Sequence, residues 1–416
     1  MSSFTVVKNS EDNPFDRQER IEWWNQESLK NANVLVIGAG ATGNETLKNL
    51  VLLGIGNILV CDMDTISVSN LSRTVLFRKD DAGKKKAETA AIRAKEMSLE
   101  ESCSIDFFEG DIVWELGTGV FRYFDVILGC LDNVETRFAL NRNCRLVSKP
   151  WIDAGISELS GNVKVFAASE GACYQCFASD DQLTAARQRY SCDDFKKRMF
   201  SEHKMPTVQI SSAIVSALQV QEAIKIILGK KALYGKKIFF QGTTGDFEII
   251  NMQEDPNCYA HASYDNIVET PLTNTITVRE FLTFVSQPQF SNEKAVLDLR
   301  SDRNFLRSIK CANCGMTTFF YKPAFRLYSD EVKCSHCAES VEKSLYQAEN
   351  VEYVYDFSVD SEEFLLNMTL TEIGIPKLHI ISVHDSDGNY KYYELSGDLN
   401  NVMPTISTKK RGLYGN

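Results

Sequence analysis

The sequence predicts an α/β protein with a doubly wound, mostly parallel sheet, followed by a smaller α+β domain that contains zinc. Short apolar runs alternate with helical stretches from Asn33 onward, a pattern typical of a parallel sheet with helices on both faces. Beyond about residue 275 the pattern changes, and two CxxC pairs appear. The length of 416 residues is enough for two or three domains.

The expected parallel strands are short apolar runs that end in Gly or Asp, at 33–40, 57–64, 104–111 and 124–132. Helical stretches lie between them at 81–97 and 135–149. Two further apolar runs, 151–157 and 162–169, are joined by a link that is too short for a helical crossover. We therefore expect these two runs to pair antiparallel.

A polar, irregular segment at 177–205 predicts a crossover, and one helix is expected after it. Pro206 suits the first position of that helix, and Gly229 suits its C-terminal stop. The first half of the helix is apolar nearly all round, so we expect that half to be buried. Residues 236–252 predict a β-hairpin, and residues 370–398 predict another with a DG turn.

Composition and charge narrow the class of protein. The chain is 44% hydrophobic and 24% charged, with a formal net charge of -11. This acidic balance argues against a nucleic-acid-binding surface, which needs a basic stripe. The N-terminus has neither the apolar core nor the basic flank of a signal peptide, and no apolar run approaches the ~18 residues of a membrane span. We therefore expect a cytoplasmic protein that binds neither nucleic acid nor membrane.

A glycine turn follows the first expected strand and predicts a nucleotide site. Gly38, Gly40 and Gly43 form GxGxxG between a strand and a helix, which lets a phosphate approach the helix N-terminus. Asp62 lies about 20 residues further on, where a carboxylate can hold ribose hydroxyls. These residues alone favour a dinucleotide oxidoreductase as much as any other nucleotide-binding protein.

The charged residues after this turn favour phosphoryl or adenylyl transfer over redox chemistry. Acids and cations are clustered in one stretch that contains Asp62, Asp64, Asn70, Arg73, Lys84 and Lys86. Acids can bind Mg²⁺, while Arg and Lys can neutralise phosphate oxygens. The alternative is a solvated, charged loop without a function.

Four segments of the chain resemble the ThiF/MoeB/ubiquitin-activating superfamily. They are "GAGATGNETLKNLVLLGIGNILVCDMDTISVSNLSRTVLFR", "DAGKKKAE", "CLDNVETR" and "PTVQISSAIVSALQVQEAIKIILG". The resemblance covers roughly residues 14–262 and implies a ThiF-type, Rossmann-like adenylation domain. It also implies ATP-dependent adenylation of the C-terminal carboxylate of a small ubiquitin-like or sulfur-carrier protein.

The resemblance implies roles for individual residues. Asp62 would bind the ribose, and Mg²⁺ would be bound by Asp64 and Asp132. The triphosphate would be contacted by Asn70, Arg73 and Lys86. "FDRQ" matches the N-terminal arginine motif of the superfamily, so Arg17 would reach the ATP of a partner subunit in a homodimer.

The chain departs from the usual pattern of the superfamily at three positions. Ala41 and Thr42 replace commoner residues of the turn, and their small side chains fit it. Thr74 stands where glutamine is usual. The domains expected are an N-terminal arm at 1–32, an adenylation domain at 33–270 that contains the crossover 177–205, and a C-terminal domain at 275–416 with a zinc ribbon at 305–340.

Two sets of ligands predict structural zinc. Cys173 and Cys176 form a CxxC pair, and the resemblance implies that Cys258 and His261 complete a tetrahedral site with His261 in place of a last thiolate. The alternative for this set is unrelated buried cysteines. The second set is a zinc-ribbon pattern of two CxxC pairs, in which the repeated spacing favours Cys337 over His336. Its members are Cys311, Cys314, Cys334 and Cys337.

Among the remaining cysteines, Cys192 is the candidate nucleophile. Arg and Lys residues surround it in the sequence, and cations lower the pKa of a thiol. It lies in the crossover that holds the catalytic cysteine of ubiquitin-activating relatives, so we expect it to form a carrier thioester. The alternative is an incidental cysteine. We expect Cys61 and Cys130 to lie in the core, while Cys103 and Cys144 have no functional context.

These observations predict an enzyme that activates a ubiquitin-like protein with ATP and passes it from Cys192 to a conjugating enzyme. The tail of the chain resembles activating enzymes of bacterial ubiquitin-like operons, so the C-terminal domain is expected to dock the carrier or the conjugating enzyme, or to cap the fold. The closest rival function is that of a sulfur-carrier adenylyltransferase like ThiF or MoeB, without an obligatory thioester. Two more distant rivals are a NAD-dependent oxidoreductase and a non-enzymatic zinc scaffold.

Overall fold

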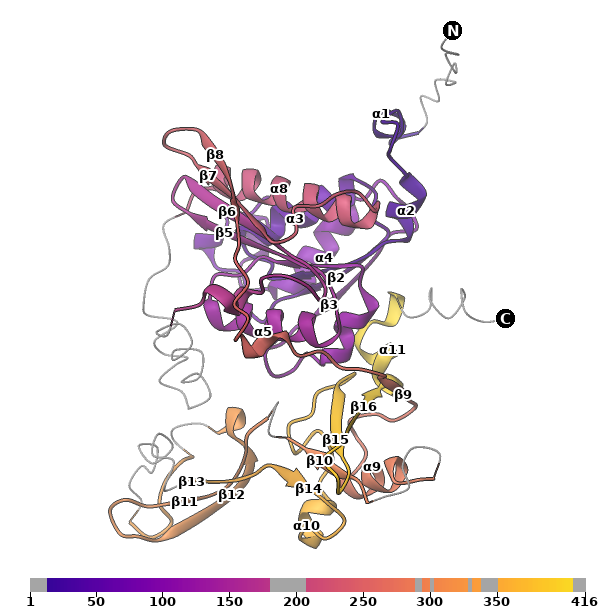
Figure 1. Cartoon of the computed structure of the whole chain (residues 1–416). Coiled ribbons are helices and arrows are strands. Elements are labelled where there is room, and N and C mark those ends of the chain that lie inside the picture. Colours follow the sequence, from indigo (N-terminus) through magenta and orange to yellow (C-terminus); the bar gives the residue numbers. More distant parts are fainter. Residues whose placement is uncertain are drawn as a thin grey trace.

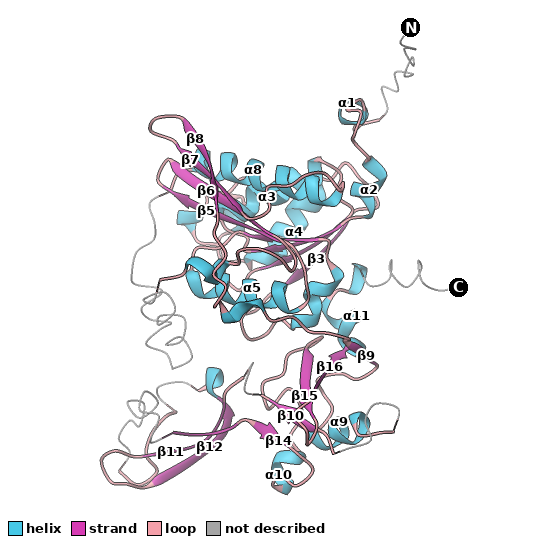
Figure 2. Cartoon of the chain, in the orientation of Figure 1, coloured by secondary structure: helices cyan, strands magenta, loops and turns pink. Residues whose placement is uncertain are grey.

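The computed structural model describes residues 13–179, 207–288, 294–299, 303–327, 331–337 and 351–406. Figure 1 shows an eight-stranded sheet with helices on both faces and, below it, a smaller part built on a five-stranded and a three-stranded sheet. Figure 2 shows that the long helices belong to the larger part. The N-terminal arm contributes α1 (Asp16–Glu19) and α2 (Gln26–Asn31).

The parallel half of the large sheet forms as the sequence predicts. Its strands are β1 (Asn33–Ile37), β2 (Asn57–Cys61), β3 (Ser104–Phe108), β4 (Val126–Gly129) and β5 (Trp151–Ser157). Their order in the sheet is β3-β2-β1-β4-β5. The strand order reverses between β1 and β4. Open α/β sheets bind ligands at the carboxyl ends of strands beside such a reversal.

The antiparallel half of the large sheet is also as predicted. β5 pairs antiparallel with β6 (Ser160–Phe166), and the predicted hairpin is formed by β7 (Lys236–Gln241) and β8 (Asp246–Asn251). β7 pairs with β6, so the sheet continues from parallel to antiparallel without a break. Every residue of β8 is exposed at this edge.

Both faces of the parallel strands are buried, because each face is covered by helices. Val34 and Val36 pack with α3 (Ala41–Leu52), α4 (Lys86–Met97) and α8 (Gln209–Ile227). Leu35 and Ile37 point to the opposite face, where α5 (Val134–Leu146) and the 3₁₀ helix η3 (Thr118–Tyr123) lie. Two covered faces explain why these strands are continuous apolar runs.

Helix α8 differs from the prediction at its start and in its burial. It begins at Gln209 rather than at Pro206, which lies outside the described residues. Gly229 stops the helix as predicted, with φ at 63° and hydrogen bonds from the Gly229 and Lys230 amides to Ile226 and Lys225. The prediction that the whole first half of the helix is buried is wrong, because Ile210 is 61% exposed.

The buried face of α8 is instead rich in polar groups that bond to neighbouring backbone. Gln219, for example, is fully buried and donates to the carbonyls of Gly129 and Ile152. In the described part of the chain, α8 is the one helix long and apolar enough to cross a membrane. Half of its apolar window is buried, and it packs against α3 and the large sheet as a core helix does.

The described residues of the smaller part form two sheets and several short helices. The five-stranded sheet has the order β14-β10-β15-β16-β9, and the three-stranded sheet has the order β12-β11-β13. The strands are β9 (Val268–Thr270), β10 (Val296–Asp298), β11 (Phe305–Lys310), β12 (Thr317–Pro323), β13 (Val351–Val354), β14 (Asp356–Phe357), β15 (Ile380–His384) and β16 (Tyr390–Leu395). The helices are α9 (Val278–Val285), α10 (Glu363–Leu366) and α11 (Leu399–Val402). The predicted DG turn joins β15 to β16, which pair antiparallel, and its Gly388 has φ of 82°.

The two parts share buried contacts that the sequence did not predict. Val402, Met403 and Ile406 belong to the apolar core beneath the large sheet. The carboxylate of Asp106 on β3 accepts hydrogen bonds from the amides of Thr405 and Ile406, each at 3.1 Å. Residues 402–406 therefore help to cover one face of the large sheet.

Candidate functional site

The glycine turn between β1 and α3 is shaped by backbone packing. Gly38 has φ of 97°, and a Cβ there would lie 2.4 Å from the Cys130 carbonyl oxygen. A Cβ on Gly43 would lie 1.9 Å from the Gly38 oxygen, so neither position admits a side chain. Gly40 is the N-cap of α3, and a Cβ there would meet nothing within 4 Å among the described atoms. The open N-terminus of α3 offers amide groups to an anion.

Asp62 ties the end of β2 to this turn. Its carboxylate accepts hydrogen bonds from the amides of Ala39, at 2.7 Å, and Asp64, at 2.8 Å. Burial raises the pKa of Asp62, and the nearby Lys86 and these two amides act in the opposite direction. The predicted ribose ligand is therefore held beside the glycine turn.

Lys86, the first residue of α4, brings the predicted acids together. Its ammonium lies 2.8 Å from Oδ2 of Asp64, and its side chain is only 12% exposed. Burial alone would lower the pKa of Lys86, but the nearby carboxylates more than reverse this and raise it. Those carboxylates belong to Asp62, Asp64 and Asp132. The site thus contains a cation near acids from two separate segments, one after β2 and one after β4.

Asp132 follows β4, on the other side of the strand reversal. It is exposed, and its Oδ1 accepts a hydrogen bond of 3.2 Å from the Asn133 amide group. Asn133 also caps α5 by accepting from the Thr136 amide at 2.8 Å. Carboxylate oxygens are the ligands that Mg²⁺ prefers, and the roles of Asp132 and the half-exposed Asp64 as ligands of this ion stay predictions.

Asn70 and Arg73 lie on the loop that joins β2 to α4. Asn70 ends the 3₁₀ helix η1 (Val68–Asn70), and its Oδ1 accepts from the Ser67 amide at 2.9 Å. Arg73 donates to the Ser69 carbonyl at 3.1 Å. Both predicted triphosphate contacts are therefore used in local bonds within this loop.

Arg17 is not brought to this cluster by its own chain. It lies on α1, which stands out from the large sheet at the end of the N-terminal arm, and it is exposed (Figure 1). Cys192 lies outside the described residues, as does most of the crossover 177–205. The predicted roles of these two residues stay predictions.

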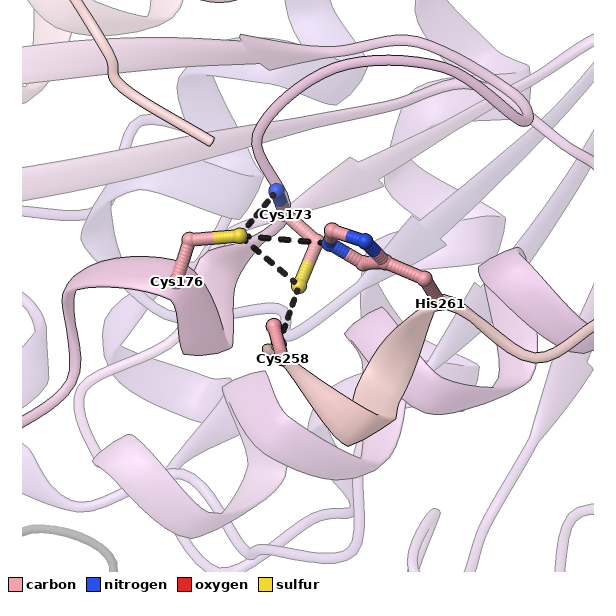
Figure 3. A group of neighbouring side chains, drawn as sticks. All are labelled: Cys173, Cys176, Cys258 and His261. Atoms are coloured by element: carbon pink, nitrogen blue, oxygen red, sulfur yellow. Dashed lines mark hydrogen bonds between the residues drawn. The ribbon is translucent and has the colours of Figure 1, made fainter. Parts of the chain in front are cut away.

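The first predicted metal set converges in space. Figure 3 shows the side chains of Cys173, Cys176, Cys258 and His261 pointing toward one another. Sulfur–sulfur distances are 3.7 Å for Cys173–Cys258 and 3.8 Å for Cys173–Cys176, and His261 Nε2 lies 3.2 Å from the Cys176 sulfur. A tetrahedral zinc site with Zn–S bonds of about 2.3 Å has sulfur–sulfur edges of about 3.8 Å. The set therefore fits Zn²⁺.

His261 has the surroundings of a metal ligand. Its Nδ1 lies 3.4 Å from Oε1 of Glu254, which can orient the ring so that Nε2 faces the sulfurs. Burial and the nearby Arg145 lower the pKa of His261. A lowered pKa favours the neutral imidazole, which is the form that binds a metal.

The second predicted metal set also converges, and Cys337 rather than His336 completes it. The ligand atoms of all four cysteines lie within 4.8 Å of one another. Sulfur–sulfur distances are 3.8 Å for Cys311–Cys337 and 3.5 Å for Cys314–Cys334. Cys311 and Cys314 follow β11, so the set could hold a tetrahedral zinc ion at the end of the three-stranded sheet.

The described cysteines outside these sets are poor nucleophiles. Cys61, Cys103 and Cys144 are buried, and Cys130 is half-buried. Burial raises the pKa of Cys130 to about 12, and burial also raises the pKa values of Cys61 and Cys144 above the ordinary thiol value. The prediction that Cys61 belongs to the core is confirmed.

A buried charge cluster beside Asp132 escaped the sequence reasoning. Arg137 and Lys164 both bind the carboxylate of Asp153, which is fully buried on β5. One signal was available, because an Asp inside the apolar run "WIDAGIS" must find a partner if both faces of its strand are covered.

Comparison with known proteins gives the family. Residues 15–260 match the model of the ThiF family. The chain is 38% identical over 151 residues to SUMO-activating enzyme subunit 2 of Dictyostelium discoideum, covering 36% of this chain and 22% of that protein. It is 30% identical over 246 residues to adenylyltransferase and sulfurtransferase MOCS3 of Drosophila persimilis, covering 59% of this chain and 51% of that protein. The chain thus spans about half or less of the length of these two relatives.

Two further similarities agree with membership of the ThiF family. The chain is 29% identical over 239 residues to sulfur carrier protein adenylyltransferase of Thermus thermophilus, covering 56% of this chain and 83% of that protein. The structure of E. coli MccB with ATP has the same fold, with a TM-score of 0.51 and 23% identity over 61% of this chain and 75% of that one. The glycine turn, the acids around Lys86 and the first metal set all lie within or at the end of the matched region, and the chain belongs to the ThiF family.

Proposed function

We propose that this chain is an adenylyltransferase that activates the C-terminal carboxylate of a ubiquitin-like protein with ATP. The observation that supports this best is the arrangement of Lys86 among Asp62, Asp64 and Asp132, beside the open N-terminus of α3. A dinucleotide oxidoreductase has little use for such a cluster of acids and cations. An enzyme that handles a triphosphate needs both.

In the proposed reaction a carrier carboxylate oxygen attacks the α-phosphorus of ATP, and pyrophosphate leaves. Asp62 holds the ribose, and Asp64 and Asp132 hold the Mg²⁺ that offsets phosphate charge. Lys86 and Arg73 neutralise phosphate oxygens, with Asn70 as a further contact. A second copy of the chain supplies Arg17, so the active form is a homodimer. Binding carrier and ATP side by side supplies the proximity that the reaction needs.

The second step of the proposal is transfer of the carrier from the adenylate to Cys192. The thiolate sulfur attacks the acyl carbon, AMP leaves, and a thioester forms for handover to a conjugating enzyme. Two observations support Cys192. Cations surround it in the sequence, and the remaining cysteines either belong to the two metal sets or have raised pKa values or buried side chains.

A sulfur-carrier adenylyltransferase without a thioester is the second candidate. The similarity to the Thermus thermophilus protein, 83% of which is covered by this chain, favours it. The two candidates share the adenylation step and differ in whether Cys192 is acylated.

Two assays on the purified chain test the proposal. In the first, ATP–pyrophosphate exchange is measured with a panel of recombinant ubiquitin-like and sulfur-carrier proteins. Exchange stimulated by one of them is expected, and none with any member would count against adenylation. In the second, the stimulating carrier is incubated with enzyme and ATP, and non-reducing gels are run with and without thiol. A thiol-sensitive adduct that is absent from Cys192→Ala supports activation for conjugation. Exchange without any adduct supports the second candidate.

A further inference from the structure

A buried guanidinium holds the backbone on both sides of Asp132. Arg137 lies in the first turns of α5, and its side chain is 11% exposed. Its Nη2 donates to the Leu131 carbonyl at 2.5 Å, and its Nη1 donates to the Asn133 carbonyl at 3.4 Å. The Leu131 carbonyl belongs to the peptide group just before Asp132, and the Asn133 carbonyl belongs to the peptide group just after Asn133. One side chain therefore constrains the backbone on both sides of the Asp132–Asn133 pair.

Asp153 fixes the other end of this arrangement. The Arg137 Nε donates to Oδ1 of Asp153 at 2.7 Å, and Nη2 also reaches the Ala154 carbonyl at 3.3 Å. The remaining oxygen of Asp153 accepts from Lys164 on β6 at 2.7 Å. The guanidinium therefore joins the loop after β4 to the middle of β5, and it cannot rotate without losing several bonds at once.

The cluster also touches the first metal set. The Lys164 ammonium lies 5.1 Å from the centre of the Tyr174 ring, within the range of a cation–π interaction. Tyr174 lies between Cys173 and Cys176, in the 3₁₀ helix η4 (Tyr174–Phe177). The metal set thus lies at the far end of a row of contacts that begins at the Asp132 loop.

Fold stability alone is a weak reason for this cluster. Replacing a buried ion pair by apolar residues of similar volume is often neutral or stabilising. What a guanidinium adds is geometry, because its donors lie in one rigid plane and a lysine in the same place is a single flexible point charge. Here the guanidinium donates to the carbonyls of Leu131 and Asn133, the two residues next to the proposed metal ligand Asp132.

We propose that Arg137 is a positioning residue that holds the Asp132 loop in the geometry for Mg²⁺ binding. The inference rests on the proposed function, in which Asp132 is a Mg²⁺ ligand. Arg137 acts through the backbone, since its donors are engaged by Leu131, Asn133, Asp153 and Ala154. Asp153 in turn is the anchor of Arg137. Residues that orient a metal ligand commonly contribute about 10–100-fold to affinity.

The test measures metal binding rather than turnover. Mn²⁺ is titrated by electron paramagnetic resonance into the full chain with α,β-methylene-ATP. The variants are Arg137→Lys and Asp132→Asn, with Arg145→Lys as the matched control. Arg145 is a buried arginine two turns further along α5, and it donates to the Gly171 carbonyl instead of the Asp132 loop. Zinc content and the unfolding temperature of each variant show whether it is folded.

Arg137→Lys is expected to weaken Mn²⁺ binding at least about tenfold, with nucleotide affinity in the absence of metal unchanged and Arg145→Lys like the wild type. In the Asp132→Asn background, Arg137→Lys is expected to have no further effect, because its role runs through Asp132. Wild-type Mn²⁺ binding by a folded Arg137→Lys, or equal weakening in Arg145→Lys, would overturn the inference and leave the proposed function standing. Unchanged binding in Asp132→Asn would instead overturn the metal role of Asp132 within the proposed function.

Discussion

The ammonium of Lys86 lies 2.8 Å from the carboxylate of Asp64, at the carboxyl edge of the large sheet. The lysine side chain is 12% exposed and the aspartate side chain 45% exposed, so the aspartate is the more accessible member of the pair. An incoming triphosphate must share Lys86 with Asp64, and a metal ion on Asp64 would release the lysine toward phosphate oxygens. The proposed adenylation depends on this transfer of Lys86 from the Asp64 carboxylate to the phosphate oxygens.

Lys86→Met should lower carrier-stimulated ATP–pyrophosphate exchange about 10²–10³-fold, the usual loss when one preorganised donor to a developing charge is removed. Lys85→Met is the matched control, because Lys85 is the exposed neighbour and should exchange at the wild-type rate. Equal rates in Lys86→Met and the wild type would remove Lys86 from the catalytic groups.

Elemental analysis of the purified chain should find two zinc ions, one for each converging set. Cys258→Ala should lower the content to one, because three ligands do not hold a structural site. His261→Cys should keep both ions, since a fourth thiolate also gives a tetrahedral site. Loss of zinc from His261→Cys would mean that the imidazole is required for a reason other than coordination.

Buried thiols should resist alkylation in the native chain at about pH 8. Burial raises the pKa of Cys130 to about 12, so at that pH its thiol is neutral and unreactive. Iodoacetamide labelling followed by peptide mass spectrometry should leave Cys61, Cys130 and Cys144 unmodified until denaturant is added. Cys130→Ser should still form the carrier adduct, whereas Cys192→Ala should not. Rapid native labelling of Cys130 would reopen the choice of nucleophile.

Asp81 should stabilise the loop before Lys86 in a pH-dependent way. Burial would raise the pKa of Asp81, but hydrogen bonds from Lys84, from the Arg78 amide and from Arg93 bring it down to about 2. This is below the ~3.9 of an unfolded aspartate, so the stabilisation is complete above about pH 4 and is lost as the pH falls toward 2.

Urea unfolding of Asp81→Asn should therefore show a lower midpoint than the wild type at about pH 6, and the gap should narrow below about pH 4. Asp80→Asn, at the exposed neighbour, should unfold like the wild type at each pH. A gap that stays constant over this whole range of pH would show that the effect is not electrostatic.

The junction of the two parts should be sensitive to a single charge. Glu394 is fully buried, and it accepts bonds from Arg122 and from the Tyr123 hydroxyl, the latter at 2.7 Å. Arg122→Met leaves this carboxylate buried without its cation and should cost about 3–5 kcal/mol in unfolding free energy. Arg122→Met combined with Glu394→Gln should recover much of that loss, because the unpaired charge is gone. If the double variant is no more stable than Arg122→Met, burial of the charge is not the cause.

The sequence by itself determined the features that depend on local spacing. Alternating apolar runs predicted the parallel strands, the three glycines predicted the turn, and the repeated CxxC spacing predicted the second metal set. The first metal set was predicted from its CxxC pair together with the family resemblance. The strands and the turn are patterns of a few residues, where backbone geometry alone controls which side chains can meet. The metal sets join pairs that lie further apart, such as Cys173 and Cys258, which are separated by 85 positions. The presence of the helix after the crossover was also predictable, although its start at Gln209 was not.

Only the tertiary structure decided which distant groups meet. The clamp of Arg137 on Asp153 depends on the packing of α5 against β5. The hydrogen bonds that the Thr405 and Ile406 amides donate to Asp106 join residues about 300 positions apart. In the sequence, the polar residues on the buried face of α8 are typical of a solvent-exposed helix surface. The structure shows that they are buried and that Gln219 donates hydrogen bonds to neighbouring carbonyls. An apolar pattern in the sequence shows that a face of a helix or strand must be buried. The pattern does not show which segment buries it, because many segments offer a similar hydrophobic face and packing decides among them.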